Sequence, residues 1–120
     1  MLFDFDTFER CAKLAHRESR TGYSFTEAID VFRCYFETYE FLFDTAHPAI
    51  SRQQIKSIIE KMSYCGHEHD HLEISPDMYP ALIRRHFETR YRNCDFNINH
   101  FFSGRIRLMR FWDCEKSGDI

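Results

Sequence analysis

The chain has 120 residues, of which 43% are hydrophobic and 17% aromatic, with only four glycines and three prolines. This length suits one domain with a sizeable core, and the scarcity of turn residues excludes a disordered chain and an all-β fold built on many tight turns. The formal net charge is only −3, and no apolar stretch approaches the roughly 20 residues of a membrane-spanning helix. The N-terminus lacks the basic start of a secretory signal. We therefore expect a soluble, cytoplasmic protein with a single helical domain over residues 1–120.

Five cysteines are spread along the chain without any Cys-x-x-Cys pair: Cys11, Cys34, Cys65, Cys94 and Cys114. An odd number of widely spaced cysteines is typical of reduced core thiols in an intracellular protein. We expect no disulfide framework.

The spacing of apolar residues predicts two helices in the N-terminal half. The first is expected over about residues 4–20, with acidic residues in its first turns and Gly22 as the stop signal. The second is expected over about residues 25–43, because Ser24 and Glu27 have the spacing of a capping box at its start. Aromatic residues follow on more than one side of this second helix, which indicates a central position in the fold.

Two further helices are predicted on either side of a loop. Ser51 and Gln54 form a second capping box, which predicts a third helix over about residues 51–63. Residues 64–74 have no helical period and are expected to form a loop. A serine–proline pair then begins a fourth helix, expected over about residues 76–92.

The segment from residue 95 to residue 112 has two interpretations. As a helix capped by Asn97, it places most of its apolar residues on one side, and Gly104 costs such a helix only about 1 kcal/mol. As a β-hairpin it would turn at Ser103-Gly104, and we keep a short C-terminal hairpin in residues 96–112 as the alternative. The helix is favoured, and the tail from Glu115 is expected to be frayed. The predicted fold class is all-α, an irregular bundle of four to five helices.

The loop carries the pattern closest to a metal site, at Cys65, His67, His69 and His71. Thiolate and imidazole are ligands that zinc prefers, and alternate residues of an extended segment point to the same side. The spacing fits no common zinc module, and four ligands within seven residues strain a tetrahedral geometry. The alternatives are a solvated polar loop and a pH-sensitive loop. Zinc is the one cofactor that the sequence suggests.

Arginines are concentrated in the C-terminal third, at Arg84, Arg85, Arg90, Arg92, Arg105, Arg107 and Arg110. Guanidinium groups suit phosphates and carboxylates, so this set predicts contact with nucleic acid or with an acidic partner. Against nucleic acid stand the negative net charge of the chain and a loop too long for a helix-turn-helix. The arginines could instead pair with acidic residues of the same chain.

The first two helices carry the opposite charge. Within the second helix, the candidate residues for binding a basic partner are Asp30, Glu37, Glu40 and Asp44. An acidic helical surface can occupy a basic groove that normally holds a phosphate backbone. The alternative is an ordinary solvated face.

The sequence contains no glycine-rich phosphate loop, no Gly-x-Ser-x-Gly and no His-Glu-x-x-His motif, so we do not expect an enzyme. We expect a small binding protein that regulates or inhibits a larger protein or nucleoprotein partner through charged helical faces. Small domains without catalytic motifs are typical of phage or mobile-element accessory proteins, including anti-defence inhibitors. The alternatives are a nucleic-acid-binding accessory domain and a zinc-binding protein. The sequence is also compatible with a homodimer.

Overall fold

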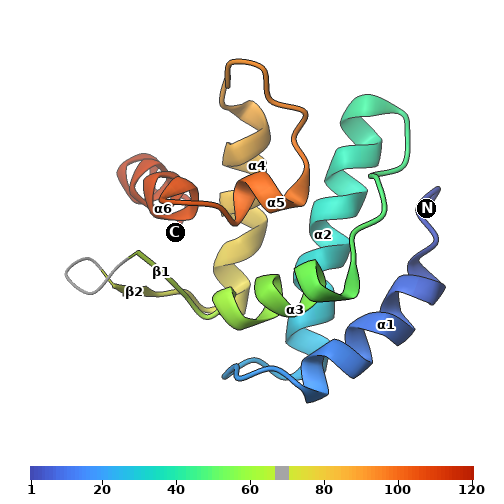
Figure 1. The fold of residues 1–120 in the computed structure, drawn as a ribbon. Coiled ribbons are helices and arrows are strands. Elements are labelled where there is room, and N and C mark those ends of the chain that lie inside the picture. The colour runs from blue at the N-terminus through green and yellow to red at the C-terminus, as the bar shows by residue number, and fades with distance from the viewer. Residues whose placement is uncertain (67–70) are drawn as a thin grey trace.

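The computed structural model describes residues 1–66 and 71–120. Over these residues the protein is mainly helical and has one two-stranded antiparallel sheet, as Figure 1 shows. The prediction of an all-α, irregular bundle is therefore confirmed. Among the described residues, no helix combines the length and the apolar character needed to cross a membrane.

Helices α1 (Phe5–Arg17) and α2 (Phe25–Phe43) form the N-terminal half. Helix α1 ends three residues before the predicted position, because the Ser19 hydroxyl donates to the Ala15 carbonyl and closes the last turn. The predicted capping box at the start of α2 is confirmed, since Ser24 accepts from the Glu27 N–H and the Glu27 side chain accepts from the Ser24 N–H.

Helix α3 (Arg52–Lys61) begins at the predicted second capping box, which is also confirmed. The segment predicted as a loop is corrected in part, because strands β1 (Tyr64–Cys65) and β2 (Leu72–Glu73) pair there as an antiparallel hairpin. Each strand has only two residues, too few for an alternating sequence pattern to show.

A short 3-10 helix η1 (Pro76–Met78) leads into helix α4 (Tyr79–Glu88), as the serine–proline pair predicts. The predicted end of this helix near residue 92 is wrong. The backbone becomes extended at Thr89, whose hydroxyl donates to the Arg85 carbonyl at 2.7 Å and satisfies the end of the helix.

The ambiguous C-terminal segment forms two helices, α5 (Ile98–Phe101) and α6 (Ile106–Ser117). The alternative of a hairpin in residues 96–112 is therefore wrong, and so is a single continuous helix. The break falls at Gly104, whose φ of 51° lies in the left-handed region that favours glycine. The expected fraying from residue 115 is also wrong, because Arg85 donates to Ser117 at 2.9 Å and to Asp119 at 3.3 Å.

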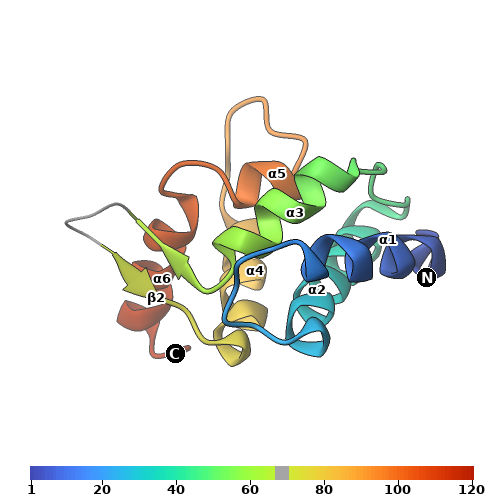
Figure 2. The same ribbon diagram turned by 60° about the horizontal axis from the view of Figure 1, so that its bottom comes forward.

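The buried side chains form one continuous cluster around α2 and α4. These two helices lie side by side, α1 and α3 pack together, and α6 packs against α4 (Figure 1). In the rotated view the hairpin extends from the body of the protein beside α6 (Figure 2). Among the largest fully buried side chains are Phe32, Tyr35, Phe36, Tyr79 and Phe101. The prediction that α2 is central is confirmed.

Candidate functional site

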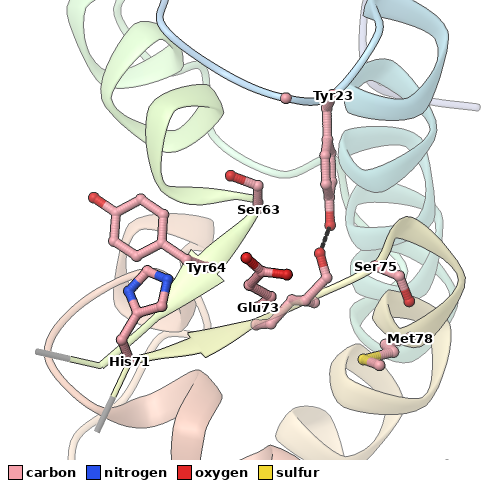
Figure 3. Close-up of a pocket in the computed structure, with 9 residues that line it drawn as sticks. Tyr23, Ser63, Tyr64, His71, Glu73, Ser75 and Met78 are labelled. Carbon is pink, nitrogen blue, oxygen red and sulfur yellow. Dashed lines mark hydrogen bonds between the residues drawn. The ribbon is translucent and has the colours of Figure 1, made fainter. Parts of the chain in front are cut away.

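An open pocket of about 560 Å³ lies between the hairpin and the loop that joins α1 to α2. The rings of Tyr64 and His71 stack on its wall with centroids 5.1 Å apart, and the Glu73 carboxylate lies near them (Figure 3). The Tyr23 hydroxyl donates to the Ile74 carbonyl and so ties the hairpin to the body. The described walls of the pocket form an open depression that exposes apolar as well as polar groups.

The two predicted zinc ligands that the structure describes, Cys65 and His71, lie on opposite sides of the hairpin. Cys65 is 2% exposed and pairs with Leu72, whereas His71 is exposed and stacks on Tyr64. Neighbouring strand residues point to opposite faces, so Cys65 and His71 are not brought together. His67 and His69 lie outside the described residues. Within residues 1–66 and 71–120, no group of three His, Cys, Asp or Glu side chains is arranged to hold a metal ion.

Arg107 is buried and holds the hairpin to the end of α3. Its Nη1 donates to the carbonyls of Lys61 at 2.6 Å and Tyr64 at 2.9 Å, and lies 3.2 Å from the Tyr79 hydroxyl. The guanidinium also lies over the Phe102 ring, 4.8 Å from its centroid. A cation at the carbonyl end of a helix stabilises it. This arginine therefore acts within the fold.

Arg110 belongs to a buried polar chain. Its Nη1 donates to the Tyr91 hydroxyl at 2.8 Å, and its Nε lies 3.2 Å from an oxygen of Asp113. The Tyr91 oxygen is 3.0 Å from Nδ1 of His86, which is fully buried. Burial, with the nearby His100 and Arg110, lowers the pKa of His86 to about 3.

Three of the other five arginines contact groups of the same chain. Arg85 anchors the C-terminal tail, and Arg84 lies 3.9 Å from Asp119 of the same tail. Arg105 lies over the Trp112 ring at 5.7 Å. The remaining two, Arg90 and Arg92, are exposed around the end of α4.

Two of the four acidic candidates share a stripe on one side of α2. Asp30 and Glu37 lie seven residues apart within the helix, which places them on the same side, and Asp30 also pairs with Arg33 at 3.2 Å. Asp44 follows the last residue of the helix and has a left-handed backbone with a φ of 52°, so helical spacing does not fix its direction. Glu40 lies outside this stripe, and its carboxylate accepts from the backbone N–H groups of Leu2 at 3.0 Å and Phe3 at 2.5 Å. Glu40 therefore fastens the N-terminal segment to α2.

Phe41 lies on the same side of α2 as Asp30 and Glu37. It is four residues after Glu37 and three before Asp44, and it is 86% exposed, more than any other large hydrophobic side chain described. Sequence reasoning missed it because every aromatic residue of this helix was assigned to the core. The signal was present in its spacing, which places Phe41 on the acidic side. We call Asp30, Glu37 and Phe41, together with Asp44 directly after the helix, the acidic face of α2.

No protein-family model, curated protein or solved structure matches the chain. The class that the fold defines is a small, mainly α-helical protein with a two-residue-strand hairpin.

Proposed function

We propose that this is a non-enzymatic binding protein that uses the acidic face of α2 to regulate or inhibit a larger partner with a basic surface. The observation that carries the proposal is the exposure of Phe41, at 86%, one helical turn after Glu37 on the same side of α2. Aromatic side chains are enriched at the centres of protein–protein interfaces, so an exposed phenylalanine beside carboxylates supports a role as an anchor.

The two kinds of side chain have complementary roles in binding. Burying an exposed phenylalanine contributes about 1.5–3 kcal/mol, which is enough to make Phe41 the main anchor. The carboxylates of Asp30, Glu37 and Asp44 accelerate encounter with a basic partner and set the orientation. A rigid acidic helix also imitates the charge of a phosphate backbone, which supports a nucleic-acid-processing protein as the target. Within this proposal, the protein acts in the cytoplasm as an anti-defence inhibitor that occupies a nucleic-acid-binding surface of its target.

The nucleic-acid alternative finds less support. It needs the arginine set to act together, whereas Arg107 and Arg110 are 5% and 8% exposed and donate to groups of the same chain. Salt-dependent binding to a phosphate backbone requires cations that can reach it.

The test is affinity purification from lysates of cells that naturally encode the protein, with Phe41→Ser and Glu37→Lys compared against Leu14→Ser. Leu14 is a matched control, because it is a large apolar residue, 46% exposed, on α1. We expect one basic protein to be recovered equally with the wild type and Leu14→Ser, and at least about tenfold less with the other two variants.

Recovery that does not depend on Phe41 or Glu37 would refute the proposal, as would the absence of any recovered basic protein. Raising the salt concentration should weaken the recovered interaction, since exposed charges are screened. Circular dichroism of each variant checks that the helices are intact.

A further inference from the structure

The loop between α4 and α5 holds a thiol against an imidazole. Cys94 Sγ lies 3.2 Å from Nδ1 of His100, and the Phe96 N–H donates to the same sulfur at 3.2 Å. Cys94 is partly exposed, so a small molecule can reach it. A cysteine paired with a histidine base is the arrangement that activates a thiol as a nucleophile.

The loop around Cys94 is held in an uncommon conformation. Asn93 and Phe96 both have positive φ, at 55° and 58°, which is costly for an aromatic residue. The Tyr35 hydroxyl donates to the Phe96 carbonyl at 2.7 Å, and the Phe96 ring stacks on Phe87 with centroids 5.2 Å apart. These contacts fix Phe96 in the conformation that directs its N–H at the sulfur. Backbone strain held in place by packing is a feature of functional sites.

Further polar side chains surround the pair of Cys94 and His100. The His100 ring lies 4.8 Å from Tyr91 and 5.3 Å from His86, measured between centroids. Among the described residues, the buried side-chain atoms without a hydrogen-bond partner are Nε2 of His86 and Nε of Arg110. Arg110 Nε is within ion-pair distance of Asp113, but its hydrogen is not aligned with the carboxylate. Unpartnered buried polar atoms are rare in folded proteins, and a redox or catalytic role is one of their known explanations.

We propose that Cys94 is a thiol-modification site that exchanges with small disulfides, with oxidised glutathione as the representative substrate. The Cys94 thiol gives its proton to Nδ1 of His100, and the sulfur attacks one sulfur of the disulfide. A new S–S bond forms between Cys94 and one glutathione, and the old S–S bond breaks. The departing glutathione sulfur takes the electron pair of that bond and then the proton from His100. One protein thiol is oxidised and one glutathione is reduced, so the exchange balances.

Two other cysteines provide internal controls. Burial raises the pKa of the Cys34 thiol, and burial likewise raises the pKa of Cys114, which is in the core. A thiol that burial keeps protonated reacts slowly, because the thiolate is the nucleophile. Cys34 is the closer match, because it is partly exposed like Cys94.

The experiment incubates the native full-length protein with oxidised glutathione at pH 7 and follows each cysteine by peptide mapping and mass spectrometry. We expect Cys94 to be modified at least about tenfold faster than Cys34. His100→Gln should lower the rate at Cys94 about tenfold, because the substitution removes the base. The pH dependence of the Cys94 rate should change in His100→Gln, which a merely structural role of His100 would not produce. Cys34→Ser should leave the Cys94 rate unchanged.

The proposal is overturned if Cys94 reacts no faster than Cys34, or if His100→Gln leaves both the rate and its pH dependence unchanged. Unfolding of the variant would be recognised at once, because Cys34 and Cys114 would then react together with Cys94. The comparison of Cys94 with Cys34 in the wild-type protein needs no substitution, so it decides the proposal in that case.

Discussion

Replacing Arg107 with methionine is the sharpest test of whether the arginines of this chain serve the fold or a partner. The substitution keeps a long apolar stem in place but removes the guanidinium. The carbonyls of Lys61 and Tyr64 then lose their donor, and both lie at the junction between α3 and β1. The substitution therefore weakens the attachment of the hairpin to the helical bundle.

The magnitude follows from the contacts. Nη1 carries two hydrogens, so two of its three close contacts count as full hydrogen bonds, each worth about 1.5–3 kcal/mol when the donor is charged. Part of this loss of stability is offset, because a buried methionine, unlike a buried arginine, carries no charge that must be removed from water on folding. We expect the free energy of unfolding to fall by about 3 kcal/mol, which is a large share of the total for a domain of this size.

Urea denaturation followed by circular dichroism measures this change. With an m-value of about 2 kcal/mol per M, the midpoint should fall by about 1.5 M. Arg84→Met is the matched control, because the Arg84 side chain is 62% exposed, and its loss should cost less than about 0.5 kcal/mol. If the two variants unfold at the same urea concentration, the assignment of Arg107 to the interior of the fold is wrong.

Three further changes test the fold. First, His86 is neutral in the folded protein, because burial lowers its pKa to about 3, and burial also lowers that of His47. The unfolded chain takes up protons below about pH 6.5 that the folded chain does not, so urea midpoints should fall between pH 6.5 and pH 4, with each histidine contributing up to about 1.4 kcal/mol per pH unit. A flat profile would contradict the buried positions of both. Second, Gly104→Ala should cost about 1 kcal/mol in a thermal melt, since the φ of 51° disfavours a side chain although space is open; Gly104→Asn should lose less. Third, Ser51→Ala should cost about 1 kcal/mol by removing the cap of α3, and an unchanged urea midpoint would show that the cap contributes nothing.

The four helices before residue 90 could be predicted because their signals are local. The Ser24 and Ser51 capping boxes and the spacing of apolar residues are contained within each segment. The ends of helices that depend on distant residues could not be predicted. Helix α6 extends to Ser117 because Arg85, 32 positions earlier, holds its last turn. The hairpin was missed because its strands are too short to leave a pattern.

The candidate sites show the same division. The sequence named Asp30, Glu37, Glu40 and Asp44 as candidates, but only the structure shows that Glu40 holds the N-terminal segment and that Asp44 lies beyond the end of α2. The sequence shows that arginines are concentrated in the C-terminal third. It does not show that Arg107 donates to backbone carbonyls and Arg110 to the Tyr91 hydroxyl within the same chain. The contact between Cys94 and His100 could not be predicted either. It depends on a left-handed backbone conformation at Phe96, which a phenylalanine in the sequence does not indicate.

The contacts of Arg107 also bear on the order in which the protein folds as it is made. The arginine reaches back to the carbonyls of Lys61 and Tyr64, across 46 and 43 positions of the chain. During synthesis the hairpin leaves the ribosome well before α6 exists, so the hairpin must wait for the last helix before it is fastened. Helices α1 and α3 are both synthesised before α6, so the contacts between them can form first. Folding should therefore proceed from the N-terminal helices towards the hairpin, which is fastened only when Arg107 is present.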